Sequence, residues 1–557
     1  MFPPGAHGWA VLGSRYSRGR SIPTSLNCIK NALPRLMEVR PQAELSRAER
    51  PLADDARPVN GRALRFKDAG RRFAGLGGMV DADFVVVGGG TAGCVLARRL
   101  LDLTDGTVLL LEAGERDTNP AIHDPVRMHE LWDSAQDWGL RTVPQRDAAN
   151  RPLHLPRGRV LGGSHALNAM IHVRGNPADY DDWAARGNAG WSWAEVEPVF
   201  RRIESGPLTI LRDFTADPVQ EAILAAAQQA GVPFNADYND GDQTGVSRMQ
   251  FTIAGGLRHT TARAYLAPVL DHPRFTLVTN AHVRRLLMSG ERCVGVEWTE
   301  YDRVHRVRAG EVVLSAGAIG SPQVLLRSGI GPADDLRALG LDVVADLPGV
   351  GENLQDHWLV PTIFSAAKPI EHTPGVPPAQ THLFWRSRPG LPTPDLQPLH
   401  FSAPLYETWM SGPDNGFSLM AGLIRPESVG RLTLSSPDGP PLIDPRVLSA
   451  ASDVDALVEA VLLCQEIGHE RALAEFGADE LYPGKLELRD YVRRSVITYH
   501  HQAGTCAMGS VVDPELRVRG VAGLRVADAS VMPTIVSGNT NTPTVMIAEK
   551  AAELIAG

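Results

Sequence analysis

The chain lacks the features that define several large classes of protein. Its 557 residues include only five cysteines, an odd number without a Cys-x-x-Cys pair, so we expect a reducing cytoplasm and neither a disulfide framework nor a zinc site. No uninterrupted apolar run approaches the roughly 20 residues of a membrane span. A net charge of -9 leaves no basic excess for nucleic acid. We therefore expect a cytoplasmic protein that binds no metal and no nucleic acid.

The composition that remains is typical of a folded globular chain. Hydrophobic residues make up 43% and charged residues 21% of the sequence. A chain of 557 residues exceeds what one small core can hold, so we expect two or more domains.

The first 78 residues differ from the rest in charge. They hold 14 Lys and Arg against 6 Asp and Glu, whereas the remainder holds 41 against 58. Three interpretations stay open: an organelle transit peptide, a disordered basic arm, or an extension created by an upstream start codon. We favour the third, because Met79 directly precedes the first strand-like run. Residues 1–78 are therefore expected to be a disordered or wrongly assigned extension.

The most informative segment follows that extension. Four apolar residues run into a Gly-x-Gly-x-x-Gly turn at Gly88, Gly90 and Gly93, and after a helix-like stretch a second apolar run ends at Glu112. The three glycines permit a tight turn, a close approach of pyrophosphate, and close packing of helix on strand. The helix N-terminus offers N–H groups to phosphates, and Glu112 is placed to accept hydrogen bonds from a ribose. The pattern predicts a dinucleotide site but does not choose between NAD and FAD.

Other apolar runs indicate how the rest of the chain is organised. Further strands are predicted at residues 276–278, 283–287, 293–298 and 311–317. The proline-dense stretch 361–445 predicts a separate β-rich domain, and a helical pattern returns at 453–467. The chain closes with an amphipathic helix over 543–555.

Several motifs beyond the glycine turn resemble those of the glucose–methanol–choline (GMC) flavoprotein oxidoreductases. They lie at residues 157–168, 174–177, 317–331, 348–357, 501–509 and 524–543. Together with the turn they span nearly all of residues 79–557 in the family's order, so the sequence is identified as a member of this family.

The resemblance implies that the dinucleotide is FAD and that the fold is α/β with two interleaved parts. One part is a Rossmann-type FAD-binding domain, and the other is an α+β substrate domain with a large antiparallel sheet. We expect the FAD-binding domain to be discontinuous, over residues 79–185, 260–345 and 500–557. The substrate-binding domain would comprise residues 186–259 and 346–499.

The resemblance also implies which residues surround the cofactor. The second glycine cluster, with Val160 and Gly163, would lie against the flavin, since a flat ring needs backbone packed close to it. The other expected contacts are Thr91 and Ala92 in the first turn; Asn168, Ala169 and Met170 near the flavin's reactive edge; Val283 near the adenine; Asp528 and Ala529 at the ribityl–pyrophosphate stem; and Asn541, Thr542 and Pro543 at the pyrimidine end.

His165 departs from the family pattern, which usually has Ser or Thr there. In choline-oxidising members the histidine that attaches FAD covalently corresponds to Leu167 of this sequence. We therefore expect His165 to be a packed or hydrogen-bonded side chain.

The resemblance places the catalytic groups near the C-terminus. His501 aligns with the family's base, and the match places its partner at Asn541. Alcohol oxidation removes a hydride from carbon and a proton from oxygen, and histidine, with a pKa near 6.5, suits the proton. An asparagine amide can hold the oxygen without competing for that proton. The hydride would pass to flavin N5.

Two adjacent histidines leave a choice of base. On a strand His500 and His501 would point to opposite faces, so only one could reach the substrate. The register with the motif that follows favours His501, and leaves His500 to contact the flavin through its backbone or to pack. We expect His357, His382 and His400 to be structural, with His400 lying in the predicted substrate sheet.

These residues favour FAD-dependent oxidation of a small-molecule alcohol to its carbonyl. A dehydrogenase is favoured over an oxidase, with oxygen, a quinone or a protein as the open choices of electron acceptor. Choline is not supported, because a quaternary ammonium group needs an aromatic cage or a carboxylate, and only Tyr406, Glu407 and Trp409 suggest one. A flavin-dependent lyase on the same scaffold, for cyanohydrin cleavage or decarboxylation, stays as the alternative.

Overall fold

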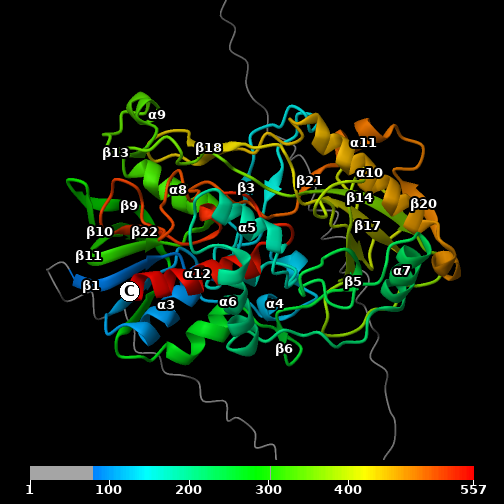
Figure 1. Cartoon of the computed structure of the whole chain (residues 1–557), viewed down its shortest axis with the longest axis horizontal. Helices are drawn as coiled ribbons and strands as arrows, with labels where there is room; N and C mark the ends of the chain where they lie inside the picture. Colours follow the sequence, from blue (N-terminus) through cyan, green and yellow to red (C-terminus); the bar gives the residue numbers. More distant parts are fainter. Residues whose placement is uncertain (1–79, 302) are drawn as a thin grey trace, which may run out of the picture.

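Two large sheets organise the chain (Figure 1). The computed structural model describes residues 80–301 and 303–557. The prediction for residues 1–78 therefore lies outside the described residues. In Figure 1 the first sheet occupies the left of the molecule, around β1 and β11, and the second occupies the right, around β14 and β17.

The first sheet holds the nucleotide-binding unit. Its strands follow the order β8 (Phe275–Val278), β2 (Val108–Leu111), β1 (Val80–Val87), β11 (Arg303–Leu314), β10 (Arg292–Glu300) and β9 (Ala281–Ser289), with β22 (Leu524–Val526) beside β11. The pairs that involve β8, β2, β1 and β22 are parallel, whereas β9 and β10 are antiparallel. The long strand β11 joins the two patterns, because its first half pairs with β10 and its last three residues pair with β22.

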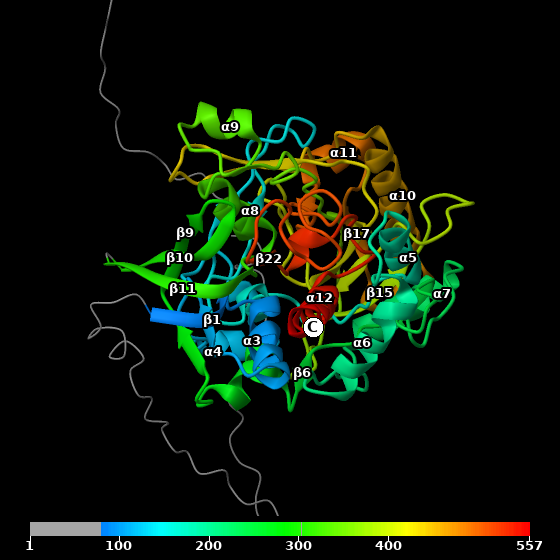
Figure 2. The same ribbon diagram turned by 60° about the vertical axis from the view of Figure 1, so that its left-hand side comes forward.

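Helices from both ends of the described chain cover this sheet. α3 (Thr91–Leu103) connects β1 to β2 and buries Val95, Leu96 and Leu100 against them. The last helix, α12 (Asn541–Ala556), packs against α3, and α6 (Trp193–Ser205) packs against α12 (Figure 2). α8 (Gly317–Arg327) follows β11 directly. One hydrophobic core thus contains residues from the start and the end of the described chain.

The second sheet is antiparallel and buried on both faces. Its strands follow the order β20 (Asp479–Tyr482), β14 (Trp358–Ser365), β17 (Gly416–Leu423), β16 (Leu399–Phe401), β15 (Ala379–Phe384) and β5 (Gly245–Arg248), with β21 (Ile497–Thr498) beside β14. Every residue of β15, β16 and β17 is buried. The alternation of polar and apolar residues that marks a half-exposed strand is therefore absent from them.

The two faces of this sheet have different neighbours. One face, with Phe417 and Leu419, packs with α10 (Ala451–Gly468) and α7 (Pro218–Gln229). The other face, with Leu399 and Met420, belongs to a separate apolar cluster.

The remaining elements are short. They are α4 (Pro120–His123), α5 (Pro177–Ala185), α9 (Ala333–Ala338) and α11 (Leu488–Ser495), and the pairs β3 (Leu140–Arg141) with β4 (His154–Leu155), β6 (Ile253–Ala254) with β7 (Leu257–Arg258), β12 (Ile330–Gly331) with β13 (Ala345–Asp346), and β18 (Arg431–Leu434) with β19 (Pro441–Asp444). Among the described residues, no helix combines the length and the apolar character that a bilayer crossing requires.

The predicted fold class is confirmed by a Rossmann-type sheet beside a large antiparallel sheet. The predicted domain boundaries stay predictions. Trp191, Phe200 and Leu208, which we expected in the substrate-binding domain, pack in the core of the first sheet.

Candidate active site

The predicted glycine turn leads from β1 into α3. Gly88 has a φ of +101°, and a Cβ on Gly93 would lie 1.8 Å from the carbonyl oxygen of Gly88. Only glycine therefore permits the helix to approach the strand so closely. No side chain caps the N-terminus of α3, and Gly90 and Thr91 line a cavity at this end. N–H groups at a helix N-terminus form an anion site.

Glu112 follows β2 beside the same turn. Its carboxylate accepts hydrogen bonds of 2.7 Å from the backbone N–H groups of Gly89 and Gly114. Burial raises the pKa of this carboxyl to about 7. The two N–H donors hold its oxygens at the cavity wall.

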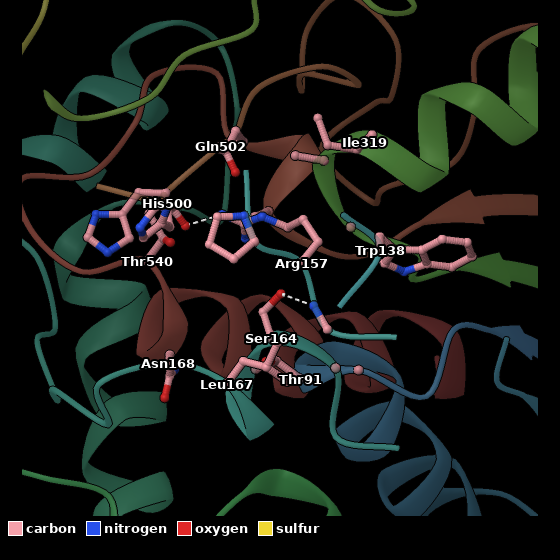
Figure 3. A pocket seen from close by; sticks show the side chains of 18 of the residues that line it. Thr91, Trp138, Arg157, Ser164, Leu167, Asn168, Ile319, His500, Gln502 and Thr540 are labelled. Atoms are coloured by element: carbon pink, nitrogen blue, oxygen red, sulfur yellow. Dashed lines mark hydrogen bonds between the residues drawn. The ribbon is translucent and has the colours of Figure 1, made fainter. Parts of the chain in front are cut away.

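The cavity has a volume of about 370 Å³ and is lined by residues from both sheets. The predicted site residues that line it are Gly88, Gly90, Thr91, Ala92, Glu112, Gly163, Asn168, Ala169, Met170, Val283, His500, His501, Asp528, Ala529 and Asn541. Figure 3 shows part of the cavity, with Thr91 and Ser164 on one side, Ile319 of α8 opposite, and His500 and Gln502 toward one end.

Four predicted cofactor residues are not part of this wall. Gly93 is taken up by the contact between α3 and Gly88, and Val160 is fully buried in a small apolar cluster. The hydroxyl of Thr542 lies 2.9 Å from Nδ1 of His172, and Pro543 is buried in the first turn of α12. The expectation that these four residues contact the cofactor stays a prediction.

His501 is held in place by backbone and ring contacts. The chain leaves β21 at Thr498, and His500 has a φ of +67°. The two histidines therefore do not sit on a continuous strand as the sequence suggested. The backbone N–H of His501 donates to Asp356 Oδ1 at 2.8 Å, and its ring stacks on Tyr499 with centroids 4.7 Å apart.

The asparagine within hydrogen-bond distance of His501 is Asn539, whereas we expected Asn541. Nδ2 of Asn539 lies 3.2 Å from Nε2 of His501. Asn541 is the first residue of α12, where its Oδ1 accepts from Thr91 Oγ1 at 3.0 Å and its Nδ2 lies 3.4 Å from His165 Nε2. The loop that precedes α12 turns between the two asparagines, so their side chains reach different neighbours.

A glutamine fixes the orientation of the Asn539 amide. Gln397 Nε2 donates to Asn539 Oδ1 at 3.1 Å, and the same nitrogen lies 3.1 Å from Nδ1 of His382. Because Oδ1 is engaged by Gln397, the amide nitrogen of Asn539 points toward His501. Sequence reasoning missed both Asn539 and Gln397.

A third residue that the sequence did not assign to the catalytic pair, His357, contacts the other ring nitrogen of His501. Nδ1 of His357 lies 3.0 Å from Nδ1 of His501. An amide N–H from Asn539 needs a bare nitrogen as acceptor, so Nε2 of His501 is unprotonated and its proton is on Nδ1, where His357 accepts it. Burial, then the neighbouring His357, holds the pKa of His501 well below its usual range. His501 is therefore a neutral ring whose Nε2 lone pair accepts a hydrogen bond from Asn539 in the cavity wall.

His500 is held by a buried arginine. Its carbonyl oxygen accepts a hydrogen bond from Arg157 Nη2, which Figure 3 shows as a dashed line. Its ring packs against Trp132, with centroids 5.2 Å apart. Burial keeps the pKa of His500 well below its usual range.

The other singled-out histidines lie outside the wall. His165 is fully buried, with Nε2 3.0 Å from Thr252 Oγ1 and Nδ1 accepting from the backbone N–H of Thr261 at 3.2 Å. His400 is also buried, with Nδ1 2.9 Å from Thr381 Oγ1. Leu167, which lines the cavity, offers no nucleophile.

One cluster of potential metal ligands lies beside the cavity. Within the described residues it comprises Asp133, Asp137 and His154. Arg141 forms an ion pair with Asp133 at 3.1 Å, and Asp137 accepts N–H groups from Asp133, Gly139 and Arg157. These contacts already engage Oδ1 of Asp133 and both carboxylate oxygens of Asp137.

Comparison with protein families gives two matches in the same chain. The N-terminal model of the GMC oxidoreductases matches residues 82–359, and their C-terminal model matches residues 426–548. The first match contains the glycine turn and His357, and the second contains His501 and Asn539.

Individual relatives agree over most of the chain. The mitochondrial choline dehydrogenase of Mus musculus is 41% identical, over 86% of this chain and 90% of its own length. The crystal structure of pyridoxine 4-oxidase from Mesorbium loti has a TM-score of 0.81 and 34% identity, covering 85% of this chain and 99% of that one. A formate oxidase from Aspergillus oryzae RIB40, studied for FAD modification, has a TM-score of 0.79 and 27% identity, covering 86% and 98%.

Proposed function

The chain belongs to the GMC oxidoreductase family, and we propose that it oxidises an alcohol to a carbonyl with His501 as the base and Asn539 as its partner. The observation that carries this proposal is the 3.2 Å pair of His501 Nε2 and Asn539 Nδ2 in the wall of a cavity that also contains the glycine turn. The predicted family, FAD cofactor and oxidoreductase activity on CH–OH groups are confirmed.

The residues at the glycine turn fit FAD. A Cβ on Gly163 would lie 2.6 Å from the Cα of Gly90, so only glycine lets the two loops meet beside the cavity. The N-terminus of α3 would receive the pyrophosphate, Glu112 the ribose hydroxyls and Val283 the adenine. Asn168, Ala169 and Met170 would lie at the flavin, with Asp528 and Ala529 along the stem.

The proposed reaction divides the alcohol's hydrogen atoms between two acceptors. When bound, FAD supplies the hydride acceptor. Nε2 of His501 takes the hydroxyl proton, and Nδ2 of Asn539 donates a hydrogen bond to the alcohol oxygen. Because Gln397 holds the Asn539 amide and His357 holds the His501 ring, both groups meet the alcohol already oriented.

Membership of the family does not identify the electron acceptor, so our proposal for the acceptor goes further than the family assignment. We favour a dehydrogenase, as in the mouse relative, with a quinone or a protein as acceptor, although the pyridoxine relative is named an oxidase. A lyase remains the second candidate, since the retained His501 could also accept a proton during cyanohydrin cleavage. Net flavin reduction by an alcohol distinguishes oxidation from a lyase reaction.

The location proposed for the protein is the cytoplasm. Four cysteines in the described residues, Cys94, Cys293, Cys464 and Cys506, are buried and unpaired, as expected in a reducing compartment. The mouse relative is named mitochondrial. Imaging of a C-terminally tagged full-length chain would support the proposal by diffuse signal and contradict it by organelle signal.

The base is tested by anaerobic flavin reduction with purified protein. His501→Ala should slow reduction by alcohol by about 10²-fold or more while FAD stays bound, because a positioned base is lost. His469→Ala, which changes a surface histidine away from the cavity, is the matched control and should reduce at the wild-type rate. Wild-type reduction by His501→Ala would show that another group is the base.

A further inference from the structure

The sheet wall of the cavity is apolar. On the cavity face of the second sheet, Leu359 of β14, Leu399 and Phe401 of β16, and Met420 of β17 all line the space. Leu399 lies opposite Met420 in the strand register, and Leu359 lies beside Ile497 of β21. Leu359 comes two residues after His357, so the apolar wall begins next to the histidine that holds the base.

Lining residues outside the second sheet have the same character. Met128, Trp132, Met170 and Ile171 line the cavity and belong to or pack against the same apolar cluster as the sheet residues. Met170 has a φ of +61°. A substrate in front of His501 would thus meet methyl, methylene and aromatic groups from the sheet and from these residues.

Acidic groups in the described wall are already engaged. They are Glu112, Glu407 and Asp528. Glu112 belongs to the nucleotide turn, and Asp528 accepts hydrogen bonds from Ser321 Oγ at 2.6 Å and from the backbone N–H of Gly317 at 2.9 Å. Glu407 lies 3.7 Å from Arg151, and burial raises the pKa of its carboxyl to about 7. No acid in the described wall is thus offered to a substrate cation.

Four aromatic rings of the described residues that could contribute to a cation cage are already engaged by other groups. Tyr499 is covered by the ring of His501, and Trp132 packs against His500. Trp409, which the sequence suggested for a cage, lies under the guanidinium of Arg494 at 3.9 Å. The hydroxyl of Tyr406 donates to the carbonyl of Pro413 at 2.8 Å.

From this apolar lining we infer that the site takes alcohols with an uncharged, apolar body and discriminates against quaternary ammonium alcohols such as choline. The inference rests on the proposed alcohol oxidation and adds its substrate class. A quaternary ammonium group buried here would lose its hydration without gaining a carboxylate or an aromatic cage, which costs free energy. Burial of an alkyl group of the same shape is favourable, because apolar surface is removed from water.

The test compares choline with 3,3-dimethylbutan-1-ol, in which a carbon atom replaces the charged nitrogen and the shape is kept. Holoenzyme is mixed anaerobically with each alcohol, and the second-order rate constant of flavin reduction is measured. We expect the neutral alcohol to be favoured by about 100-fold or more, since only choline carries an unpaired charge into the apolar site. Equal rates, or a preference for choline, would overturn the inference and leave alcohol oxidation intact.

A binding measurement separates this inference from the proposed reaction. The methyl ethers of the same two alcohols cannot lose a hydroxyl proton, and their binding is followed by the change in the oxidised flavin spectrum. Tighter binding of the neutral ether supports the apolar site even if neither alcohol reduces the flavin, in which case the proposed reaction alone fails. Tighter binding of the cationic ether would overturn the apolar site.

Substitution of one wall residue, Leu359, tests whether the missing counter-charge causes the discrimination against choline. Leu359→Glu places a carboxylate beside the base, and Leu359→Gln is the uncharged control of the same size. Only the glutamate should shift the preference toward choline, by about tenfold or more, because it supplies the missing counter-charge. An equal shift in both variants would contradict the electrostatic explanation. If Leu359→Glu does not retain FAD, the same pair at Met420 makes the comparison from the neighbouring strand.

Discussion

The two ends of the cavity are lined by different parts of the polypeptide, one mainly by backbone and the other by side chains. At the nucleotide end the wall consists largely of backbone, in the turn at Gly88–Gly93 and in the loop around Gly163. At the substrate end it consists of side chains from alternate positions of a sheet, such as Leu359, Leu399 and Met420. A wall made of backbone requires glycine at fixed positions, so it is recognisable as a sequence motif. A wall made of apolar side chains tolerates many different residues, so no sequence motif identifies it.

We expect the largest difference between the two ends in how substitutions of their wall residues affect FAD retention. Gly93→Ala places a Cβ 1.8 Å from the carbonyl oxygen of Gly88, where only backbone could yield. We expect loss of bound FAD and of most soluble protein, because such backbone strain belongs to the large destabilising effects. Met420→Leu, a swap of similar volume at the substrate end, should keep FAD. The flavin-to-protein absorbance ratio measures both, and full FAD occupancy in Gly93→Ala would contradict the comparison.

The next effect separates two asparagines that the sequence does not distinguish. Asn539→Ala should lower the rate of flavin reduction by about 10²-fold, because it removes the donor beside His501. Asn541→Ala removes the contact with Thr91 at the nucleotide end, and should weaken FAD retention more than it slows reduction. Stopped-flow reduction of FAD-saturated variants checks this. A larger rate loss in Asn541→Ala would restore the original assignment.

A smaller effect is expected where a side chain acts through another. Gln397→Met keeps the size of the side chain but removes the N–H that orients Asn539. Reduction at saturating alcohol should slow by about tenfold, with little change in the alcohol's dissociation constant, because a hydrogen bond and not a wall contact is lost. The concentration dependence of reduction separates these two quantities. A change in the dissociation constant alone would identify Gln397 as a packing residue.

The smallest effect concerns pH. The pKa of His501 is held well below its usual range by burial, so the base stays unprotonated as the pH falls through 6.5 and is lost only under more acidic conditions. The rate of flavin reduction should therefore vary by no more than about threefold between pH 8 and pH 6. A half-loss of rate near pH 6.5 would show that His501 titrates like an exposed histidine.

The sequence predicted the nucleotide end in detail because each feature there has a stereochemical cause. The turn, its helix and Glu112 lie together as expected. The sequence favoured His501 over His500 as the proposed base, but it did not favour Asn539 over Asn541, since the two asparagines lie only two residues apart. His357 lay within a recognised motif and was taken as structural. Gln397 gave no signal, because its role depends on contacts with residues more than 100 positions away.

The substrate wall was beyond prediction for a related reason. β14 and β17 are buried on both faces, so their apolar runs do not reveal which residues face the cavity and which face α10. The face is decided by the pairing of distant strands. Only the assembled sheet shows that Leu359 and Met420 share a wall, whereas Leu419 lies behind it.

The contact between α3 and α12 also bears on how the protein is made. Thr91 and Asn541, which share a hydrogen bond, are 450 residues apart. At a translation rate of 5–20 residues per second, α3 emerges from the ribosome roughly 20 to 90 s before α12 is synthesised. During that interval the apolar side of α3 that packs against α12 in the folded protein lacks this contact. The nucleotide-binding half, although it comes first, is thus completed only at the end of synthesis, and truncation near the C-terminus would harm the fold as well as the catalytic site.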